Sequence, residues 1–147
     1  MDILKVILLV VIAIVVLGAS GAVFLSVKSR SGSAPGLING ALAPCPSTPN
    51  CVSSEPGTSA SHSIAPLDGD SWGKLPGAIE EAGGVIIART DSYIAAEFET
   101  PLMRFVDDVE FRKADDTVHV RSASRVGKSD LGANAKRIEQ LRAALKQ

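Results

Sequence analysis

The chain has 147 residues, of which 15 are Lys or Arg and 16 are Asp or Glu, and its formal net charge is −1. This balance excludes a polycation, and no aromatic platform lies among the bases, so we expect no nucleic-acid partner. Once an N-terminal apolar segment of about 30 residues is set aside, the remaining length suits one domain.

The N-terminus contains an uninterrupted apolar run, Val6–Val27, without charge or proline. About 22 residues of this kind are enough to cross the hydrocarbon core of a membrane as a helix. The alternative is a cleaved signal peptide, with Gly18–Ala22 as its small-residue cleavage zone. The apolar run resumes directly after that zone, which favours an uncleaved anchor, and the absence of a cysteine there excludes a lipoprotein signal. Residues 1–27 are therefore assigned to a membrane anchor or signal segment.

Residues 28–44 are rich in Gly, Ser, Pro and Ala, a composition that predicts a flexible linker. The predicted core residues all lie beyond Cys45. We therefore expect a chain without residues 1–40 to fold, and we assign residues 45–147 to the folded domain.

Cys45 and Cys51 are the only cysteines, and five residues separate them. Prolines stiffen this span, so a small disulfide loop is geometrically reasonable; two free thiols and a metal or catalytic pair are the alternatives. His62 and His119 are the only histidines, and we predict neither a metal site nor a cofactor. Basic residues flank both ends of the apolar run, so charge does not decide its orientation. A disulfide would place the domain on the periplasmic or another extracytoplasmic side.

Three runs between residues 93 and 125 alternate apolar and polar residues with the period of two that is typical of strands. Ile94 and Phe98 share one face of the first run, and Phe105, Val109 and Phe111 share one face of the second. This pattern predicts an antiparallel sheet with one buried face and one solvated face. On this pattern Asp108, Glu110, Arg121 and Arg125 point toward water, with cross-strand pairs joining Glu97 or Glu99 to Arg104, and Asp108 or Glu110 to Arg121.

Further elements flank these runs. We expect an edge strand over His62–Leu67, a helix that starts at Asp70 or nearer Leu75 because of Pro76, and a strand over Val85–Arg89. The last helix, Asp130–Lys146, would bury Leu131, Ile138, Leu141 and Leu145, with Asn134 on the same stripe. The predicted fold class is therefore α+β, an antiparallel sheet of four to five strands with two helices on one face, preceded by one transmembrane helix.

Asp107 breaks the alternation, because it falls on the apolar face between Phe105 and Val109. A buried carboxylate must be paired, hydrogen-bonded or protonated. Ser122 and Ser124 fall on the same face, so the residues at this end of the sheet predict a polar pocket. The alternatives are a structural pair with Arg125 or Arg137, a helix cap, or a bulge that turns Asp107 outward. Strand parity predicts that Asp107→Ala is much more destabilising than Asp108→Ala.

Four motifs resemble the domain of unknown function 1499 family, which is found in bacteria and plastids and has no established activity. They are Cys-Pro-x-x-Pro-Asn-Cys-Val-Ser-Ser at 45–54, Tyr-Ile-x-Ala-Glu-Phe at 93–98, Arg-Phe-Val-Asp-Asp-Val-Glu-Phe at 104–111, and the run from His119 to Asn134. Where the family often has an aromatic residue after Val126-Gly127, this chain has Lys128. The resemblance implies that a ligand would meet residues among these: Glu97, Arg104, Asp107, Asp108, Glu110, Arg121, Ser122, Ser124, Arg125, Asp130 and Asn134.

Three functions are consistent with these patterns. The first is a membrane-tethered extracytoplasmic domain that binds a small anionic ligand, a lipid head group or a membrane-protein partner. The second is a hydrolase that uses Asp107 or Asp108 as a base and Arg121 or Arg125 as a clamp. The third is a purely structural partner subunit. The candidate ligand-binding residues are Asp107, Arg121, Ser122, Ser124, Arg125 and Asn134.

Overall fold

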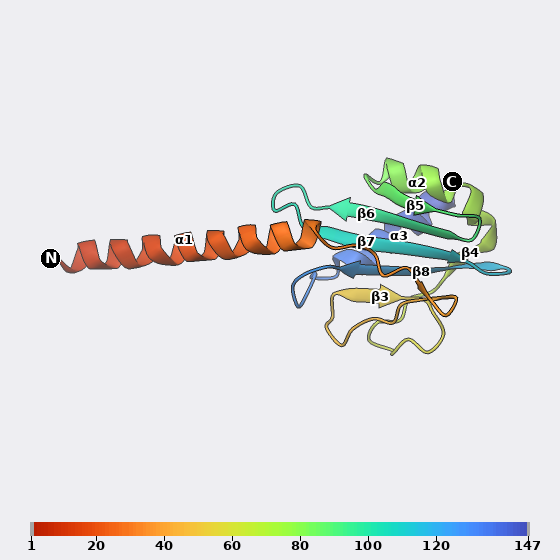
Figure 1. The fold of residues 1–147 in the computed structure, drawn as a ribbon, viewed down its shortest axis with the longest axis horizontal. Coiled ribbons are helices and arrows are strands. Elements are labelled where there is room, and N and C mark those ends of the chain that lie inside the picture. Colours follow the sequence, from red (N-terminus) through yellow and green to blue (C-terminus); the bar gives the residue numbers. More distant parts are fainter. Residues whose placement is uncertain (1, 147) are drawn as a thin grey trace.

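The computed structural model describes residues 2–146, in which a long N-terminal helix leads into an α+β domain (Figure 1). Helix α1 spans Ile3–Arg30 and projects away from the domain for most of its length. It is long and apolar enough to cross a membrane, as an anchor or as a signal sequence. Its last turns are different, because Ser26 and Ser29 are buried against the domain.

The domain contains an antiparallel sheet of six strands in the order β3-β8-β7-β6-β5, with β4 also paired to β8. The strands are β3 (Cys51–Ser53), β4 (Leu67–Asp68), β5 (Val85–Arg89), β6 (Tyr93–Glu99), β7 (Val106–Lys113) and β8 (Thr117–Ser124). The three long runs of the sequence are its centre, as predicted. The count exceeds the prediction because β3 lies within the cysteine motif, while the expected edge strand His62–Leu67 is reduced to the short β4. Strands of two or three residues leave no readable alternation in a sequence.

The helices pack on one face of this sheet. They are the 3₁₀ turn η1 (Gly69–Gly73), α2 (Leu75–Glu81) and α3 (Ala133–Leu145). Pro76 does place the start of the regular helix at Leu75, since proline is tolerated in the first turn of a helix. Ile138 and Leu141 are fully buried in the core as predicted. The predicted burial of Leu131 in this helix is wrong, because Leu131 precedes α3, adopts φ 53° and is 97% exposed.

The opposite face of the sheet is also covered, so the prediction of one solvated face is wrong. Asp108, Glu110 and Arg121 are all buried, with Glu110 at 0% exposure. The segment that follows α1 crosses this face in front of β7 and β8 (Figure 1). The Gly36 N–H donates to Glu110 Oε1 at 2.9 Å. Strand alternation could not reveal this cover, because the covering segment has little regular structure.

The covering segment lies in the Lys28–Pro44 stretch, which was expected to be a tether. It contains a hairpin of β1 (Leu37–Ile38) and β2 (Ala41–Leu42). Asn39 and Gly40 turn it with φ of 53° and 80°, the backbone that favours Asn-Gly in two-residue hairpins. Leu42 and Ala43 are buried, so the core does not begin at Cys45.

The end of α1 is joined to the sheet through Ser29. Its hydroxyl accepts a hydrogen bond from the Val106 N–H at 2.8 Å and lies 3.2 Å from the Val106 carbonyl, to which it donates. The Ser29 carbonyl accepts from Arg125 at 3.1 Å. Gly32 then passes so close to Arg125 that an added Cβ would lie 2.9 Å from its Cδ. The last turn of α1 is therefore part of the domain.

We predict that removing residues 1–40 destabilises the domain, while removing residues 1–22 does not. The longer deletion takes away the partners of Val106, Glu110 and Arg125, and each buried group left unpaired costs about 1–3 kcal/mol. Circular dichroism melting of both chains measures the difference. As a matched pair in the full chain, Ser29→Ala should lower Tm and Ser31→Ala, at an exposed hydroxyl, should not. Equal Tm values for the two truncated chains would contradict the role assigned to the segment.

Candidate functional site

The sheet divides the predicted site residues into two separate sets. Asp107 pairs in register with Ser124, and their side chains face the helices together with Ser122 and Asn134. Arg121 pairs with Glu110 on the opposite face. Arg125 reaches Asp108 and Glu97, which lie on that opposite face as well. The six residues therefore do not line one concavity, because the two sets lie on opposite faces of the sheet.

Glu110 is the centre of the first network on the face away from the helices. Arg121 Nη1 donates to Glu110 Oε2 at 3.1 Å, and the Tyr93 hydroxyl donates to Glu110 Oε1 at 2.7 Å. Burial, followed by this hydrogen bond to a carboxylate, raises the pKa of Tyr93 far above its ordinary value, so the phenol remains a neutral donor. Arg121 is thus already neutralised by a buried carboxylate, as the cross-strand pairing predicted.

Arg125 forms the second network on this face. Its guanidinium donates to both carboxylate oxygens of Asp108, at 2.8 and 2.6 Å, and also to Glu97. These hydrogen bonds, above all those that Arg125 donates to Asp108, raise the pKa of Arg125 above its ordinary value. Asp108 is 4% exposed, so its predicted position in water is wrong. Two carboxylates surround Arg125, which leaves no spare positive charge for an anionic ligand.

The helix-facing residues form a third network around Asn134 of α3. The Ser122 hydroxyl donates to Asn134 Oδ1 at 2.5 Å, and Arg137 Nη1 donates to the same oxygen at 2.8 Å. The Asn134 amide donates to Ser124 Oγ at 3.1 Å. Arg137 also donates to Asp107 Oδ2 at 2.6 Å and lies over the Phe98 ring, 4.8 Å from its centroid. Asp107 is therefore buried and paired with Arg137, one of the two structural partners that the sequence suggested.

A cavity of about 350 Å³ opens beside this third network, at the end of the domain from which α1 emerges. Its walls are formed by the end of α1, the β6–β7 loop (residues 100–105), the start of β7, the β8–α3 loop (residues 125–132) and the beginning of α3. The lining residues are Leu25, Thr100, Phe105, Val106, Asp107, Ser124, Val126, Gly127, Ser129, Asp130, Leu131 and Ala133. We name this space the α1-end cavity.

Two carboxylates give the α1-end cavity its polar part. Asp107 is 4% exposed and uses Oδ2 for Arg137, while Oδ1 receives no hydrogen bond from the described part of the chain. Asp130 accepts from the backbone N–H groups of Gly132 and Asn134 at 3.0 and 2.8 Å. Burial acts to raise the pKa of Asp130, but these hydrogen bonds outweigh it and hold the pKa below its ordinary value. The cavity therefore offers hydrogen-bond acceptors and negative charge within largely apolar walls.

The cavity walls include residues that sequence reasoning missed. Leu25 lies within the anchor and Val126 lies after the last strand, so no periodic pattern marked them as cavity residues. Phe105 was assigned to the core face of the second run, but it precedes β7 and lines the cavity instead. Leu131 was assigned to the buried stripe of the last helix and instead lies at the rim.

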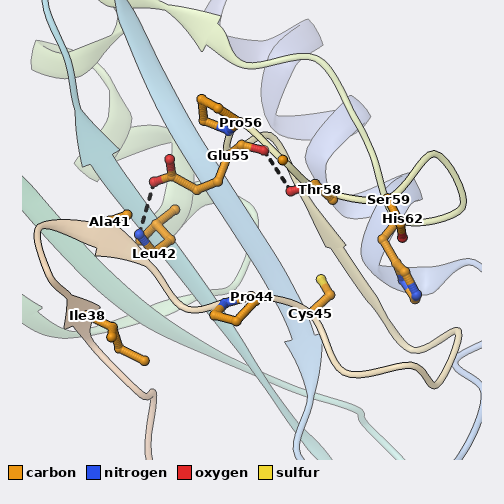
Figure 2. A pocket seen from close by; sticks show the side chains of 11 residues that line it. Ile38, Ala41, Leu42, Pro44, Cys45, Glu55, Pro56, Thr58, Ser59 and His62 are labelled. Carbon is orange, nitrogen blue, oxygen red and sulfur yellow. Dashed lines mark hydrogen bonds between the residues drawn. The ribbon is translucent and has the colours of Figure 1, made fainter.

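A second cavity, of about 450 Å³, lies between the β1–β2 hairpin and the loop that carries Glu55 and His62 (Figure 2). Its polar groups are largely engaged. Glu55 accepts from Arg112 at 2.7 and 2.8 Å and from the Leu42 N–H at 2.9 Å, bonds that hold the pKa of Glu55 low although burial acts to raise it. His62 Nδ1 donates to the Cys51 carbonyl at 2.8 Å. The polar residues around this cavity therefore serve to connect the hairpin and the neighbouring loop to the sheet. Neither Glu55 nor His62 is free of such bonds to act as an acid or a base.

The cysteine motif lies against this second cavity. Cys45 and Cys51 form a disulfide, which confirms the first of the three alternatives for the pair. Asn50, within the loop they close, donates to the Gly127 carbonyl at 2.9 Å and accepts from Asn134 through its own carbonyl at 3.1 Å. The disulfide loop therefore holds the β8–α3 loop and the start of α3 in place. Among the residues that the structure describes, no group of three or more His, Cys, Asp or Glu residues is arranged to hold a metal ion.

We predict that Asp107→Ala and Asp108→Ala are both strongly destabilising, at about 3–5 kcal/mol each, because each removes the buried carboxylate of an ion pair. The first change leaves Arg137 without its carboxylate, and the second leaves Arg125 with Glu97 alone. This replaces the asymmetry expected from strand parity. Chemical denaturation of the purified chain measures both values. The control is Glu99→Ala, which breaks an exposed pair with Arg104 and should leave the midpoint unchanged. A small loss for Asp108→Ala alone would show that its side chain is solvated after all.

Comparison with known proteins places this fold in a family. No curated protein and no solved structure matches the chain. The model of the family described as "Protein of unknown function (DUF1499)" matches residues 41–145. The match covers most of the chain and contains both the disulfide and the α3 end of the α1-end cavity. The protein belongs to the DUF1499 family.

Proposed function

We propose that this protein is a membrane-anchored, extracytoplasmic domain that binds a lipid-like amphiphile in the α1-end cavity. The observation that carries the proposal is the composition of that cavity. It combines apolar walls, one of which is the end of the candidate membrane helix, with the buried carboxylate of Asp107, whose Oδ1 has no hydrogen-bond donor among residues 2–146. An amphiphile has the matching division into an apolar part and a polar part.

The position of Leu25 supports a lipid as the occupant. A hydrocarbon core is crossed by about 20 helical residues, so an anchor that enters at Val6 leaves the core near Leu25. Leu25 lines the cavity, and Lys28 and Arg30 follow it as exposed bases in the last turn of α1. If α1 spans the membrane, the mouth of the cavity lies at the boundary between acyl chains and head groups. A lipid would reach it without leaving the bilayer completely.

The charges in the cavity define the polar end of the ligand. Asp107 and Asp130 are both acceptors; Arg137 balances the charge of Asp107, so the charge that disfavours an anion is that of Asp130, while Arg121 and Arg125 lie across the sheet in ion pairs of their own. The ligand should therefore present N–H or O–H donors, as an ammonium or a hydroxylated head group does. This choice replaces the small anionic ligand that the sequence suggested.

The hydrolase alternative receives less support from the same geometry. A clamp formed by Arg121 or Arg125 would have to act from the far face of the sheet, where both guanidiniums are bound to carboxylates. Both carboxylate oxygens of Asp108 likewise accept hydrogen bonds from Arg125, so Asp108 is not free to act as a base. Asp107 keeps one oxygen free, which suits recognition of a hydrogen-bond donor. We therefore assign Arg121, Ser122, Arg125 and Asn134 to the support of the sheet, and Asp107 and Ser124 to the cavity.

The test is lipid retention by the full-length protein, measured by native mass spectrometry from detergent micelles. We expect phosphatidylethanolamine or a monoglycosyl diacylglycerol to be retained over phosphatidylcholine and phosphatidic acid. Phosphatidylcholine has the same phosphate but no N–H donor, and phosphatidic acid tests the anionic alternative. Preference for the ammonium or for the sugar identifies which donor the carboxylate receives. Equal retention of all four lipids, or a preference for phosphatidic acid, would refute the assigned chemistry.

A matched pair of variants locates the bound lipid. Ala133→Trp places a large ring at the lining of the α1-end cavity, whereas Ala143→Trp places it at an exposed position farther along α3. We expect the first change to abolish selective retention and the second to leave it intact. If both variants retain the lipid equally, the lipid is bound elsewhere, for instance along the exposed part of α1.

A further prediction tests the side of the membrane. Disulfides persist in oxidising compartments, so the Cys45–Cys51 bond supports an extracytoplasmic domain. In intact cells a membrane-impermeant protease should cut the domain, and alkylation without reductant should modify neither cysteine. Protection from the protease until the membrane is opened, together with prompt labelling of both thiols, would place the domain on the cytoplasmic side.

A further inference from the structure

Two leucines are almost fully exposed at the end of the domain from which α1 emerges. Leu102, in the β6–β7 loop, is 89% exposed, and Leu131, in the β8–α3 loop, is 97% exposed. Both loops extend toward α1, and residues of both line the α1-end cavity with Leu25 (Figure 1). Single exposed leucines are ordinary on protein surfaces. Here two of the most exposed ones are found at the same end as an apolar helix.

The backbone of these loops is also unusual. Arg104 and Leu131 adopt φ of 54° and 53°, and the third such non-glycine residue, Asn39, is explained by its hairpin turn. The left-handed region is costly for a side chain like leucine. The fold thus holds Leu131 outward, 97% exposed, in a conformation that leucine rarely adopts.

Exposed basic residues lie at the end of α1 and in the two loops that carry the leucines. The exposed bases at this end are Lys28, Arg30, Arg104 and Lys128. Of these, Arg104 forms an ion pair with Glu99. Leucines at the centre and lysines or arginines at the edge are the arrangement that amphipathic surfaces use at a bilayer, where apolar groups enter and cations meet the phosphates. The opposite end of the β7–β8 hairpin carries Asp115 and Asp116 and has no such leucines.

From this we infer that the β6–β7 and β8–α3 loops insert Leu102 and Leu131 into the same bilayer that α1 spans, so that the domain is seated on the membrane surface. The inference rests on the anchor of the proposed function but not on a ligand in the cavity. It names the bilayer because α1 leaves the domain between these loops, and an uncleaved helix holds that end at the membrane. The hydrogen bond of Ser29 to Val106 and the close approach of Gly32 to Arg125 attach the end of α1 directly to the sheet, without a flexible linker between them.

The experiment uses the full chain in liposomes, with Trp72→Phe as the background and one tryptophan introduced at a time. Leu102→Trp and Leu131→Trp report the loops. Asp115→Trp is the control at the far end of β7, which lies roughly 23 Å from Val106 at the rise of a strand. Val15→Trp reports insertion of α1. Lipids brominated near the head-group end of the acyl chain quench tryptophans that enter the bilayer at the loops, and lipids brominated near the end of the acyl chain quench a tryptophan at position 15, which lies close to the middle of the span.

We expect brominated lipid to lower the fluorescence at positions 15, 102 and 131 by about twofold or more, and to leave position 115 unchanged. Quenching at 15 with none at 102 and 131 would overturn the seating while the anchor stands. Absence of quenching at 15 would overturn both. Leu102 does not line the cavity, so quenching there together with failed lipid retention would reject the ligand and keep the seated domain.

Discussion

Strand β7 carries acidic residues on both of its faces, and the structure depends on the neutralisation of each of them. Arg137 from α3 pairs with Asp107 on the helix side, while Arg125 and Arg121 pair with Asp108 and Glu110 on the other. A carboxylate left alone in such a position would cost several kcal/mol, so helix, neighbouring strand and covering segment have to be in place together. Buried ion pairs add little net stability over apolar packing, but they penalise every arrangement that separates them. This explains why a central strand of a small domain can be so polar and still be buried.

The same constraint explains the route of the chain after α1. The face of β7 and β8 that points away from the helices carries buried ion pairs, so another part of the chain has to cover it. Within this cover, the Gly36 N–H donates a further hydrogen bond to Glu110. The covering segment begins at Ser29, whose hydroxyl and carbonyl bond to Val106 and Arg125. A helix that looks like a simple anchor is consequently fixed to the start of β7. The position of the domain relative to any membrane follows from this junction, because little flexible chain separates the two.

The α1-end cavity lies where these constraints meet. Helix α3 must approach β7 to deliver Arg137, and the disulfide loop holds the start of α3 through Asn50 and Asn134. The two flanking loops then leave a space beside the last turns of α1. Asp107 uses one oxygen in the ion pair and also lines this space, so a residue that stabilises the fold contributes to the polarity of the cavity. Asp107 can therefore stabilise the fold through Arg137 and also contact the proposed ligand.

The sequence by itself predicted the apolar helix, the three long strands, the burial of Ile138, Leu141 and Leu145 in the last helix, and the position of Asp107 on the core face; it offered the disulfide as one of three alternatives. These follow from local periodicity and spacing, which require no knowledge of distant contacts. The motif resemblance likewise indicated the family. Only the tertiary structure decided that Asp108, Glu110 and Arg121 are buried, since their cover is an irregular segment about 70 residues earlier in the chain. Strand parity already placed Arg121 and Arg125 on the face opposite Asp107, but only the tertiary structure showed which distant side chains each residue meets there, Glu97 and Asp108 for Arg125 and Arg137 for Asp107. Leu131 remained exposed for the same reason: helical periodicity continued past the true start of α3, and only the chain's path showed where the helix begins.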